Sequence, residues 1–252
     1  MTQDRPRADR LLVERGHFES RARAQAAIAA GLVRADDRPV LRAADRLDPH
    51  ARIEAEQPHP FVSRGGLKLT AALDAFGIDP AGRHCLDVGA STGGFTDALL
   101  ARGAAHVHAV DVGRDQLHAS LRADSRVTSL EGTDARTLDA ASFARAPDLV
   151  AVDVSFISLR LVLPALVPLL APRAVLAALI KPQFEAGRDR VGRGGIVRDG
   201  AVHDEVCAGI EALLVELGFD VLGRVPSPVT GGDGNREFLV GARLAPRAGR
   251  PA

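Results

Sequence analysis

The chain has 252 residues, of which 46% are hydrophobic and 25% charged, an ordinary composition for a folded protein of one large domain or two smaller ones. Its 32 basic and 32 acidic residues cancel, so any nucleic-acid surface must come from local clustering of charge. Two cysteines, Cys85 and Cys207, are too few for a disulfide framework and match no metal-ligand spacing, so we expect a cytoplasmic protein without a metal site. The N-terminus lacks the apolar core of a signal peptide, and the apolar run 161–172 is too short and too proline-rich to span a membrane, so no membrane partner is expected.

The first elements predict a small unit of its own. Ser20 is placed to cap a helix, Gly16 to end one, and Asp36-Asp37 to make a tight turn. The predicted elements are, in order, a helix over 10–16, a helix over 21–30, a strand at 32–33 and a strand over 52–55. Between residues 5 and 34 seven arginines stand against three acidic residues, a modest excess that suits either a phosphate backbone or a solvated helical face.

A sequence pattern in this unit resembles a known RNA-binding module. Ser-Arg at 20–21, Ala-Gln at 24–25 and Ile-x-x-Gly-x-Val at 28–33 are similar to the αL module of ribosomal small-subunit protein four, which also occurs in some pseudouridine synthases. The resemblance implies that residues 5–57 form an RNA-binding αL module, followed by a linker over 58–64. The side chains that it places near phosphates are Arg10, Arg21, Arg23, Gln25 and Arg34.

From residue 65 to 245 strands and helices alternate, which predicts a doubly wound, mostly parallel α/β sheet of seven strands. The expected strands are 84–88, 106–110, 127–131, 149–152, 175–180, 221–225 and 237–242. The expected helices are 67–76, 95–102, 116–122, 158–169 and 202–217. Ligands of such sheets bind at the carboxyl ends of the strands, so the functional residues are expected there.

Aspartates stand at or just beyond the ends of the first three of these strands. Asp87 precedes a glycine turn into a helix, where backbone can approach a ligand closely and a negative charge suits a cationic sulfonium. Asp111 can accept from both hydroxyls of a ribose, and Asp134 from an adenine amino group. Ser91 stands where the dinucleotide fingerprint needs glycine, which argues against a nicotinamide enzyme. We therefore predict a Rossmann-like class I methyltransferase whose cofactor is S-adenosylmethionine. The residues expected to bind it are Asp87, Gly89, Ser91, Gly93, Gly94, Phe95, Asp111 and Asp134.

Lysine occurs at only two of the 32 basic positions, and both lie in motifs of this domain. A lysine can become neutral and act as a base, whereas arginine keeps its proton. Lys181 ends the fifth expected strand and Lys68 lies in the helix that enters the domain. Two lysines in one pocket would repel each other, which lowers the pKa of one of them. Asp153, at the end of the fourth strand, and Glu237, at the start of the last, would orient them, so we expect all four to be catalytic.

These four residues resemble the Lys-Asp-Lys-Glu tetrad of the FtsJ-type ribose 2′-O-methyltransferases. The order of Ser-Arg-Gly-Gly-x-Lys, Gly-Ala-Ser-Thr-Gly-Gly-Phe-Thr, Asp-Val-Ser-Phe-Ile-Ser-Leu and Lys-Pro-Gln-Phe-Glu is similar to that of the TlyA/hemolysin A family from about Arg10 to Leu244. The resemblance implies cytidine 2′-O-methylation of 23S rRNA and, in longer members, of 16S rRNA. The short segment after the last strand favours the 23S target. The family's linker commonly carries Arg and Trp, where this chain has His-Pro-Phe-Val at 59–62.

The expected partner is rRNA or a ribosomal subunit, and a glycine-rich loop at 187–200 is a second candidate RNA contact. Its candidate residues are Arg188, Arg190 and Arg193. Two alternatives stand beside the enzyme: a non-catalytic rRNA-binding or ribosome-assembly protein, and a membrane-active haemolysin. An amino-directed methyltransferase would carry an Asn/Asp-Pro-Pro-aromatic loop at 153–156, and a carbon-5 enzyme would need a cysteine at the site.

Overall fold

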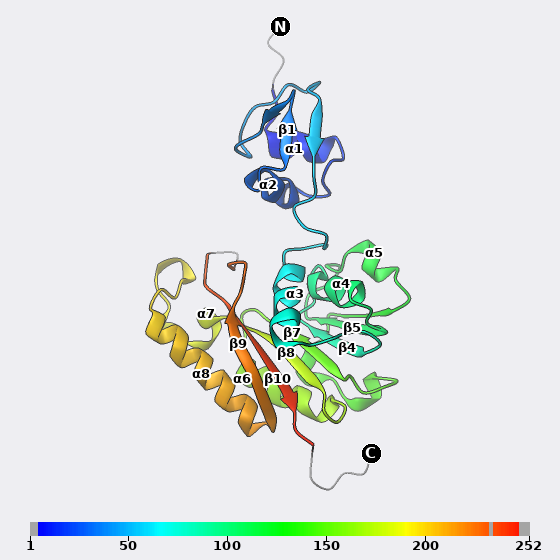
Figure 1. Cartoon of the computed structure of the whole chain (residues 1–252), viewed down its shortest axis with the longest axis vertical. Coiled ribbons are helices and arrows are strands. Elements are labelled where there is room, and N and C mark those ends of the chain that lie inside the picture. Colours follow the sequence, from blue (N-terminus) through cyan, green and yellow to red (C-terminus); the bar gives the residue numbers. More distant parts are fainter. Residues whose placement is uncertain (1–4, 232–233, 247–252) are drawn as a thin grey trace. The chain divides into compact units, whose positions relative to one another are not determined.

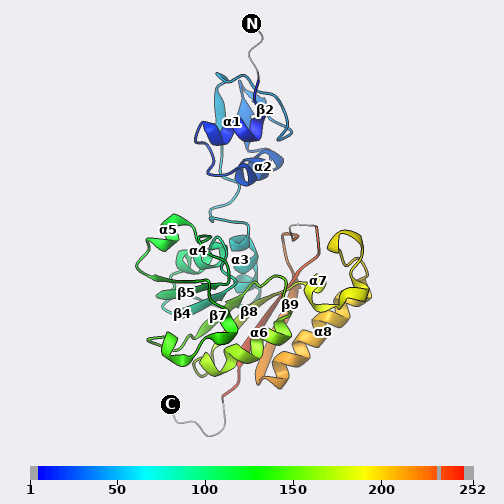
Figure 2. The same ribbon diagram turned by 180° about the vertical axis from the view of Figure 1, so that it is seen from behind.

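The computed structural model describes residues 5–231 and 234–246, and the chain divides into two compact units between Pro60 and Phe61. The division falls inside the predicted linker. Each unit has its own core, and the two are described separately (Figures 1 and 2).

The first unit packs two short helices on a small antiparallel sheet with strand order β2-β1-β3. Its elements are α1 (Ala8–Glu14), α2 (Arg21–Ala29), β1 (Val33–Ala35), β2 (Arg38–Pro39) and β3 (Ile53–Ala55). Ser20 caps α2 as predicted, since its side chain accepts a hydrogen bond from the Arg23 amide. Asp36 and Asp37 adopt positive φ angles of 47° and 61° in the tight turn between β1 and β2. Helix α1 begins at Ala8, two residues earlier than predicted.

The second unit contains a seven-stranded sheet with strand order β6-β5-β4-β7-β8-β10-β9. The strands are β4 (His84–Val88), β5 (His106–Asp111), β6 (Val127–Glu131), β7 (Leu149–Val152), β8 (Val175–Ile180), β9 (Phe219–Pro226) and β10 (Phe238–Leu244). The first five pair in parallel, and β10 runs antiparallel to both β8 and β9. The prediction of a doubly wound, mostly parallel sheet of seven strands is confirmed.

Helices cover both faces of this sheet (Figures 1 and 2). They are α3 (Gly65–Phe76), α4 (Gly94–Ala101), α5 (Ala119–Arg122), α6 (Leu159–Leu166), α7 (Pro182–Glu185) and α8 (Gly200–Glu216). Apolar residues of α3, α4 and α5 form one core with one face of the strands, whereas those of α6 and α8 form a second core with the other face. The near-continuous apolar strands, such as Val-Leu-Ala-Ala-Leu-Ile in β8, are buried on both sides, as parallel strands require.

Three local elements differ from the prediction. The helix expected over 116–122 is shortened to α5 because the Glu131 carboxylate accepts the backbone N–H groups of Gln116 and Leu117, at 2.6 and 3.0 Å. Helix α7 was not predicted, and it begins at Pro182 directly after Lys181. Strand β10 begins at Phe238, so Glu237 lies just before it.

Candidate active site

Two neighbouring cavities open at the carboxyl ends of the parallel strands. The larger has a volume of about 550 Å³ and the smaller about 230 Å³. Gly89, Ser91 and Asp153 line both, so the cavities meet at the turn after β4 and the end of β7. A ligand in one cavity could therefore react with a ligand in the other at this junction.

The turn after β4 has glycine at positions where a larger residue would overlap its neighbours. Gly89 has a φ of 85°, and a Cβ on it would overlap the backbone carbonyl of Asp153. Gly94, at the start of α4, leaves no room for a Cβ against the Ser63 hydroxyl. Glycine therefore brings the β4 turn against the end of β7, and the start of α4 against Ser63 just before α3.

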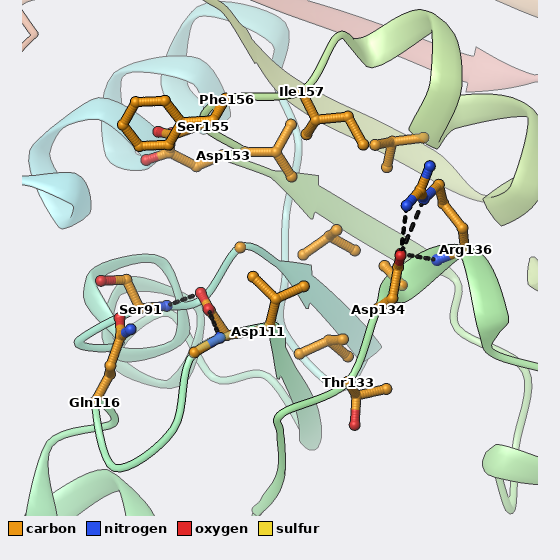
Figure 3. Close-up of a pocket in the computed structure, with 18 residues that line it drawn as sticks. Ser91, Asp111, Gln116, Thr133, Asp134, Arg136, Asp153, Ser155, Phe156 and Ile157 are labelled. Atoms are coloured by element: carbon orange, nitrogen blue, oxygen red, sulfur yellow. Dashed lines mark hydrogen bonds and ion pairs between the residues drawn. The ribbon is translucent and has the colours of Figure 1, made fainter.

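Asp111 and Asp134 line the larger cavity as predicted, with Gly89 and Ser91 (Figure 3). The Asp111 carboxylate accepts a hydrogen bond from the Ser91 amide at 2.8 Å and from the Gly113 amide at 2.7 Å. Asp134 forms an ion pair with Arg136 at 2.6 Å, and this hydrogen-bonded guanidinium lowers the pKa of the Asp134 carboxyl. Both carboxylates are thus held in fixed positions at the cavity wall.

Asp87 and Gly93 line neither cavity, although Gly94 and Phe95 line the smaller one. That Asp87 contributes to the cofactor site stays a prediction. The Asp87 side chain is fully buried, and its Oδ2 accepts a hydrogen bond from the Thr96 hydroxyl at 2.7 Å. Burial raises the pKa of Asp87 to about 7. Its other oxygen, Oδ1, has no hydrogen-bond partner among the described residues. Gly93 has a φ of 96° and caps α4, so its role is in the turn.

The four predicted catalytic residues form two ion pairs. Lys68 Nζ lies 2.5 Å from Glu237 Oε2, and Lys181 Nζ lies 2.6 Å from Asp153 Oδ1. Lys181 also donates a hydrogen bond to the Ser155 hydroxyl at 2.8 Å, whereas its approach to Asp153 is an ion pair without hydrogen-bond alignment. The side chains of both lysines are nearly enclosed, with exposures of 11% for Lys68 and 10% for Lys181.

Each lysine thus faces one of the two acids that were expected to orient the lysines. Such pairing offsets the cost of burying a charge, which is high for an unpaired ammonium group. The expected repulsion between the two lysines stays a prediction. Each pair has one member at a cavity wall: Lys68 lines the smaller cavity and Asp153 lines both, whereas Lys181 and Glu237 line neither.

Two side chains near the junction were missed in the sequence analysis. Ser155 contacts Lys181, and Phe156 is 91% exposed with a left-handed φ of 64°. Both line the larger cavity, and Figure 3 places them beside Asp153 and across the cavity from Ser91 and Asp111. A bulky residue at positive φ is rare, so the backbone conformation of Phe156 could not be expected from its type. The available signal was its place three residues after Asp153 in a strand-end motif.

Several predicted RNA-binding residues of the first unit make contacts within that unit. Arg21 and Gln25 donate to the carboxylate of Asp9, at 2.8 and 2.7 Å, together with Arg7. Asp9 is fully buried, and hydrogen bonds from Arg7 and then from Arg21 hold the pKa of its carboxyl well below the usual range. Arg21 and Gln25 thus satisfy a buried charge.

The other three candidate arginines of this unit make contacts with residues other than Asp9. Arg10 pairs with Glu14 at 2.6 Å, Arg23 donates to the Gln57 side chain at 2.9 Å, and Arg34 donates to the Asp37 carbonyl. Arg10 and Arg34 are exposed, whereas Arg23 is half-buried.

The arginine-rich loop at 187–200 contains two short helical turns, over 188–190 and 193–195. Arg188 and Arg193 are exposed, and Arg190 pairs with Glu205 at 2.6 Å. The buried side chain of Asn235 accepts from the Val197 amide at 3.1 Å and donates to the Gly195 carbonyl at 2.9 Å. The loop is therefore tied to the segment that carries Glu237.

Comparison with known proteins identifies the family. Residues 61–244 match the model of the FtsJ-like methyltransferases. The chain is 45% identical over 241 residues to the 16S/23S rRNA (cytidine-2′-O)-methyltransferase TlyA of Mycobacterium tuberculosis, covering 95% of this chain and 90% of that protein. It is 40% identical to hemolysin A of Brachyspira hyodysenteriae, covering 92% and 98%. A solved structure of a protein described as a hemolysin, from Streptococcus thermophilus, superposes with a TM-score of 0.76 at 40% identity, covering 97% and 90%. The chain belongs to the FtsJ-like methyltransferase family and, within it, to the group of TlyA and hemolysin A proteins.

Proposed function

We propose that this protein transfers a methyl group from S-adenosylmethionine to the ribose 2′-hydroxyl of a cytidine in rRNA. The observation that carries the proposal is that two ion pairs, Lys181–Asp153 and Lys68–Glu237, each have one member at the wall of the smaller cavity. The substrate is inferred from the TlyA relative, whose name specifies cytidine 2′-O-methylation of rRNA.

The larger cavity is the proposed cofactor site. Asp111 would accept from the ribose hydroxyls of the cofactor and Asp134 from its adenine, as both line the cavity with fixed carboxylates. The unpartnered, buried oxygen of Asp87 fits a cationic ligand nearby, because a positive charge favours the ionised carboxyl. S-adenosylmethionine, when bound, supplies an electrophilic methyl group on its sulfonium. The backbone at Gly89 lets the ligand approach the end of β7 closely.

The smaller cavity is the proposed entry of the acceptor ribose, since Lys68 and Asp153 line it. Lys181 is proposed to act as the base after its ammonium group has given a proton to solvent. Its neutral amine would then take the proton of the 2′-hydroxyl while the hydroxyl oxygen bonds to the methyl carbon and the bond between that carbon and the sulfonium sulfur breaks. Asp153 would balance the charge that returns to the lysine, and S-adenosylhomocysteine would leave. Lys68 is held by Glu237 and supplies a fixed positive charge that stabilises the developing oxyanion.

The proposed RNA surface includes exposed side chains in both units. In the first unit Arg10, Arg21, Gln25 and Arg34 are exposed and Arg23 is half-buried, and in the second Arg188 and Arg193 are exposed. Phe156 exposes an aromatic ring at the larger cavity, a surface on which an unstacked base can pack. No helix among the described residues is long and apolar enough to cross a membrane.

The test is methyl transfer by the purified protein. The protein is incubated with methyl-labelled S-adenosylmethionine and with free 16S rRNA, free 23S rRNA or intact subunits, and the nucleosides are then separated. We expect label in 2′-O-methylcytidine from at least one substrate. Label in a base-methylated nucleoside, or no label while the cofactor binds in calorimetry, would refute the proposal. Release of dye from liposomes, measured with the same preparation, tests the membrane-active alternative.

A further inference from the structure

Two chain segments that carry the active site lie against each other over their whole length. The aspartate segment is residues 153–159, after β7, and the lysine segment is residues 181–185, after β8. At one end Lys181 contacts Asp153 and Ser155. In the middle the rings of Phe156 and Phe184 lie 5.1 Å apart between centroids.

The far end of this contact is closed by Glu185. Its Oε2 accepts a hydrogen bond from the Ser158 hydroxyl at 2.5 Å, and its Oε1 accepts one from the Leu159 amide at 2.7 Å. Ser158 and Leu159 begin helix α6, whose first amide groups have no partner inside the helix. One half-buried carboxylate thus joins the end of the lysine segment to the end of the aspartate segment.

The aspartate segment needs such a restraint. Phe156 holds a left-handed backbone conformation with φ of 64° while its ring is 91% exposed. A strained, exposed turn persists only where the surrounding structure fixes it. Ring contact with Phe184 alone leaves the backbone of the turn free to relax, whereas hydrogen bonds to Ser158 and Leu159 fix its far end.

We infer that Glu185 is a positioning residue for the methyl-transfer reaction. It holds the aspartate segment and the lysine segment in register, and thereby places Asp153 and Ser155 against Lys181. Burial raises the pKa of the Glu185 carboxyl above its ordinary value, while the hydrogen bonds from Ser158 and Leu159 oppose this rise. The inference rests on the proposed function, because it assigns the residue a role in that reaction.

The experiment compares Glu185→Ala with Glu185→Gln in the full-length protein. Glutamine keeps both contacts, since its carbonyl can accept from Leu159 and its amide can donate to the Ser158 oxygen. Alanine removes both. We expect Glu185→Ala to lower kcat by about 10- to 100-fold, because small misplacements of reacting groups have effects of this size. Glu185→Gln should stay within about threefold of wild type, and KM for the cofactor should change little in either variant.

Asp139 offers a matched control. It also accepts from a backbone amide and a hydroxyl, both of Ser142, but this contact caps the short helix Ala140–Ser142 and does not join the aspartate segment to the lysine segment. Asp139→Ala should leave kcat unchanged. A second measurement is amide hydrogen exchange over residues 154–160, which Glu185→Ala should accelerate and Glu185→Gln should not. If Glu185→Ala does not fold, Ser158→Ala removes one of the two contacts and should give a smaller loss of kcat with the fold kept.

The positioning role would be overturned by wild-type kcat and exchange in Glu185→Ala. Equal losses of kcat in Glu185→Ala and Glu185→Gln would overturn it too, since the charge of Glu185 and not its hydrogen bonds would then matter. An equal loss of kcat in Asp139→Ala would also overturn it. If the wild-type protein transfers no methyl group to RNA, the proposed function fails, while hydrogen exchange still tests whether Glu185 holds the segment.

Discussion

Replacing Lys181 by arginine separates the charge of this residue from its capacity to exchange a proton. Lys181 Nζ lies 2.6 Å from Asp153 Oδ1 and donates to Ser155 at 2.8 Å. Arginine keeps a positive charge for Asp153, whereas alanine leaves that carboxylate unpaired. Removing one partner of a buried ion pair costs about 3–5 kcal/mol, and the 20% exposure of Asp153 places the loss toward the lower end. We therefore expect Lys181→Ala to be less stable than Lys181→Arg.

Both variants should nevertheless lose the general base, and with it the same part of the rate of methyl transfer. A positioned general base contributes about 10²–10⁴-fold, which corresponds to roughly 3–5 kcal/mol of the activation barrier. Arginine cannot release its proton near neutral pH, so it cannot accept the proton of the 2′-hydroxyl. The assay is single-turnover methyl transfer at saturating RNA and cofactor, with thermal unfolding and cofactor binding measured alongside. Lys68→Arg is the control for the larger side chain, and it should be milder because Lys68 supplies charge. An active Lys181→Arg enzyme would refute the assignment of Lys181 as the base.

Further predictions follow from individual contacts. Asp111→Ala should weaken cofactor binding by about 1–3 kcal/mol in calorimetry, whereas an unchanged affinity would place the cofactor elsewhere. The pKa of Asp87 is raised from 3.8 to about 7, so its contribution to stability is full below pH 3.8 and is lost as the pH rises through 7. In urea unfolding, Asp87→Asn should therefore gain about 4 kcal/mol relative to wild type between pH 4 and pH 8, and a pH-independent difference would contradict this. Arg23→Ala should weaken RNA binding and reduce its salt slope by about 1, measured by titration at several salt concentrations. Arg21→Ala should also lower the melting temperature, because it removes one guanidinium partner of the buried Asp9 carboxylate, and an unchanged melting temperature would contradict this.

Strand positions in this protein are predictable because parallel strands buried on both faces are apolar runs between helices. Strands β4, β6, β7 and β8 have the predicted bounds, and the carboxyl ends of β4, β5 and β7 meet at the two cavities. The residues of the tetrad were also predictable, since two lysines in an arginine-rich chain and two acids stand beside strand ends.

Pairing and burial of the site residues depend on tertiary contacts and could not be predicted in the same way. Asp87 looks like a cavity residue in the sequence because it nearly ends β4, yet its side chain is buried against Thr96. Arg21 and Gln25 match an RNA-binding pattern, although both bind Asp9, which lies far enough away in sequence that no local pattern joins them. Which lysine pairs with which acid likewise depends on the order of strands in the sheet.

Mapping of ribose methylation on cellular rRNA tests the central claim most directly. Total rRNA from cells that lack this protein is compared with rRNA from the same cells supplied with the wild-type protein or with Lys181→Arg. Because a 2′-O-methyl group protects the adjacent phosphodiester from alkaline cleavage, each methylated ribose appears as a gap in the cleavage ladder. We predict a gap at a cytidine that is present with the wild-type protein and absent both without it and with Lys181→Arg. Identical ladders in all three samples, or a gap restored by Lys181→Arg, would contradict the account.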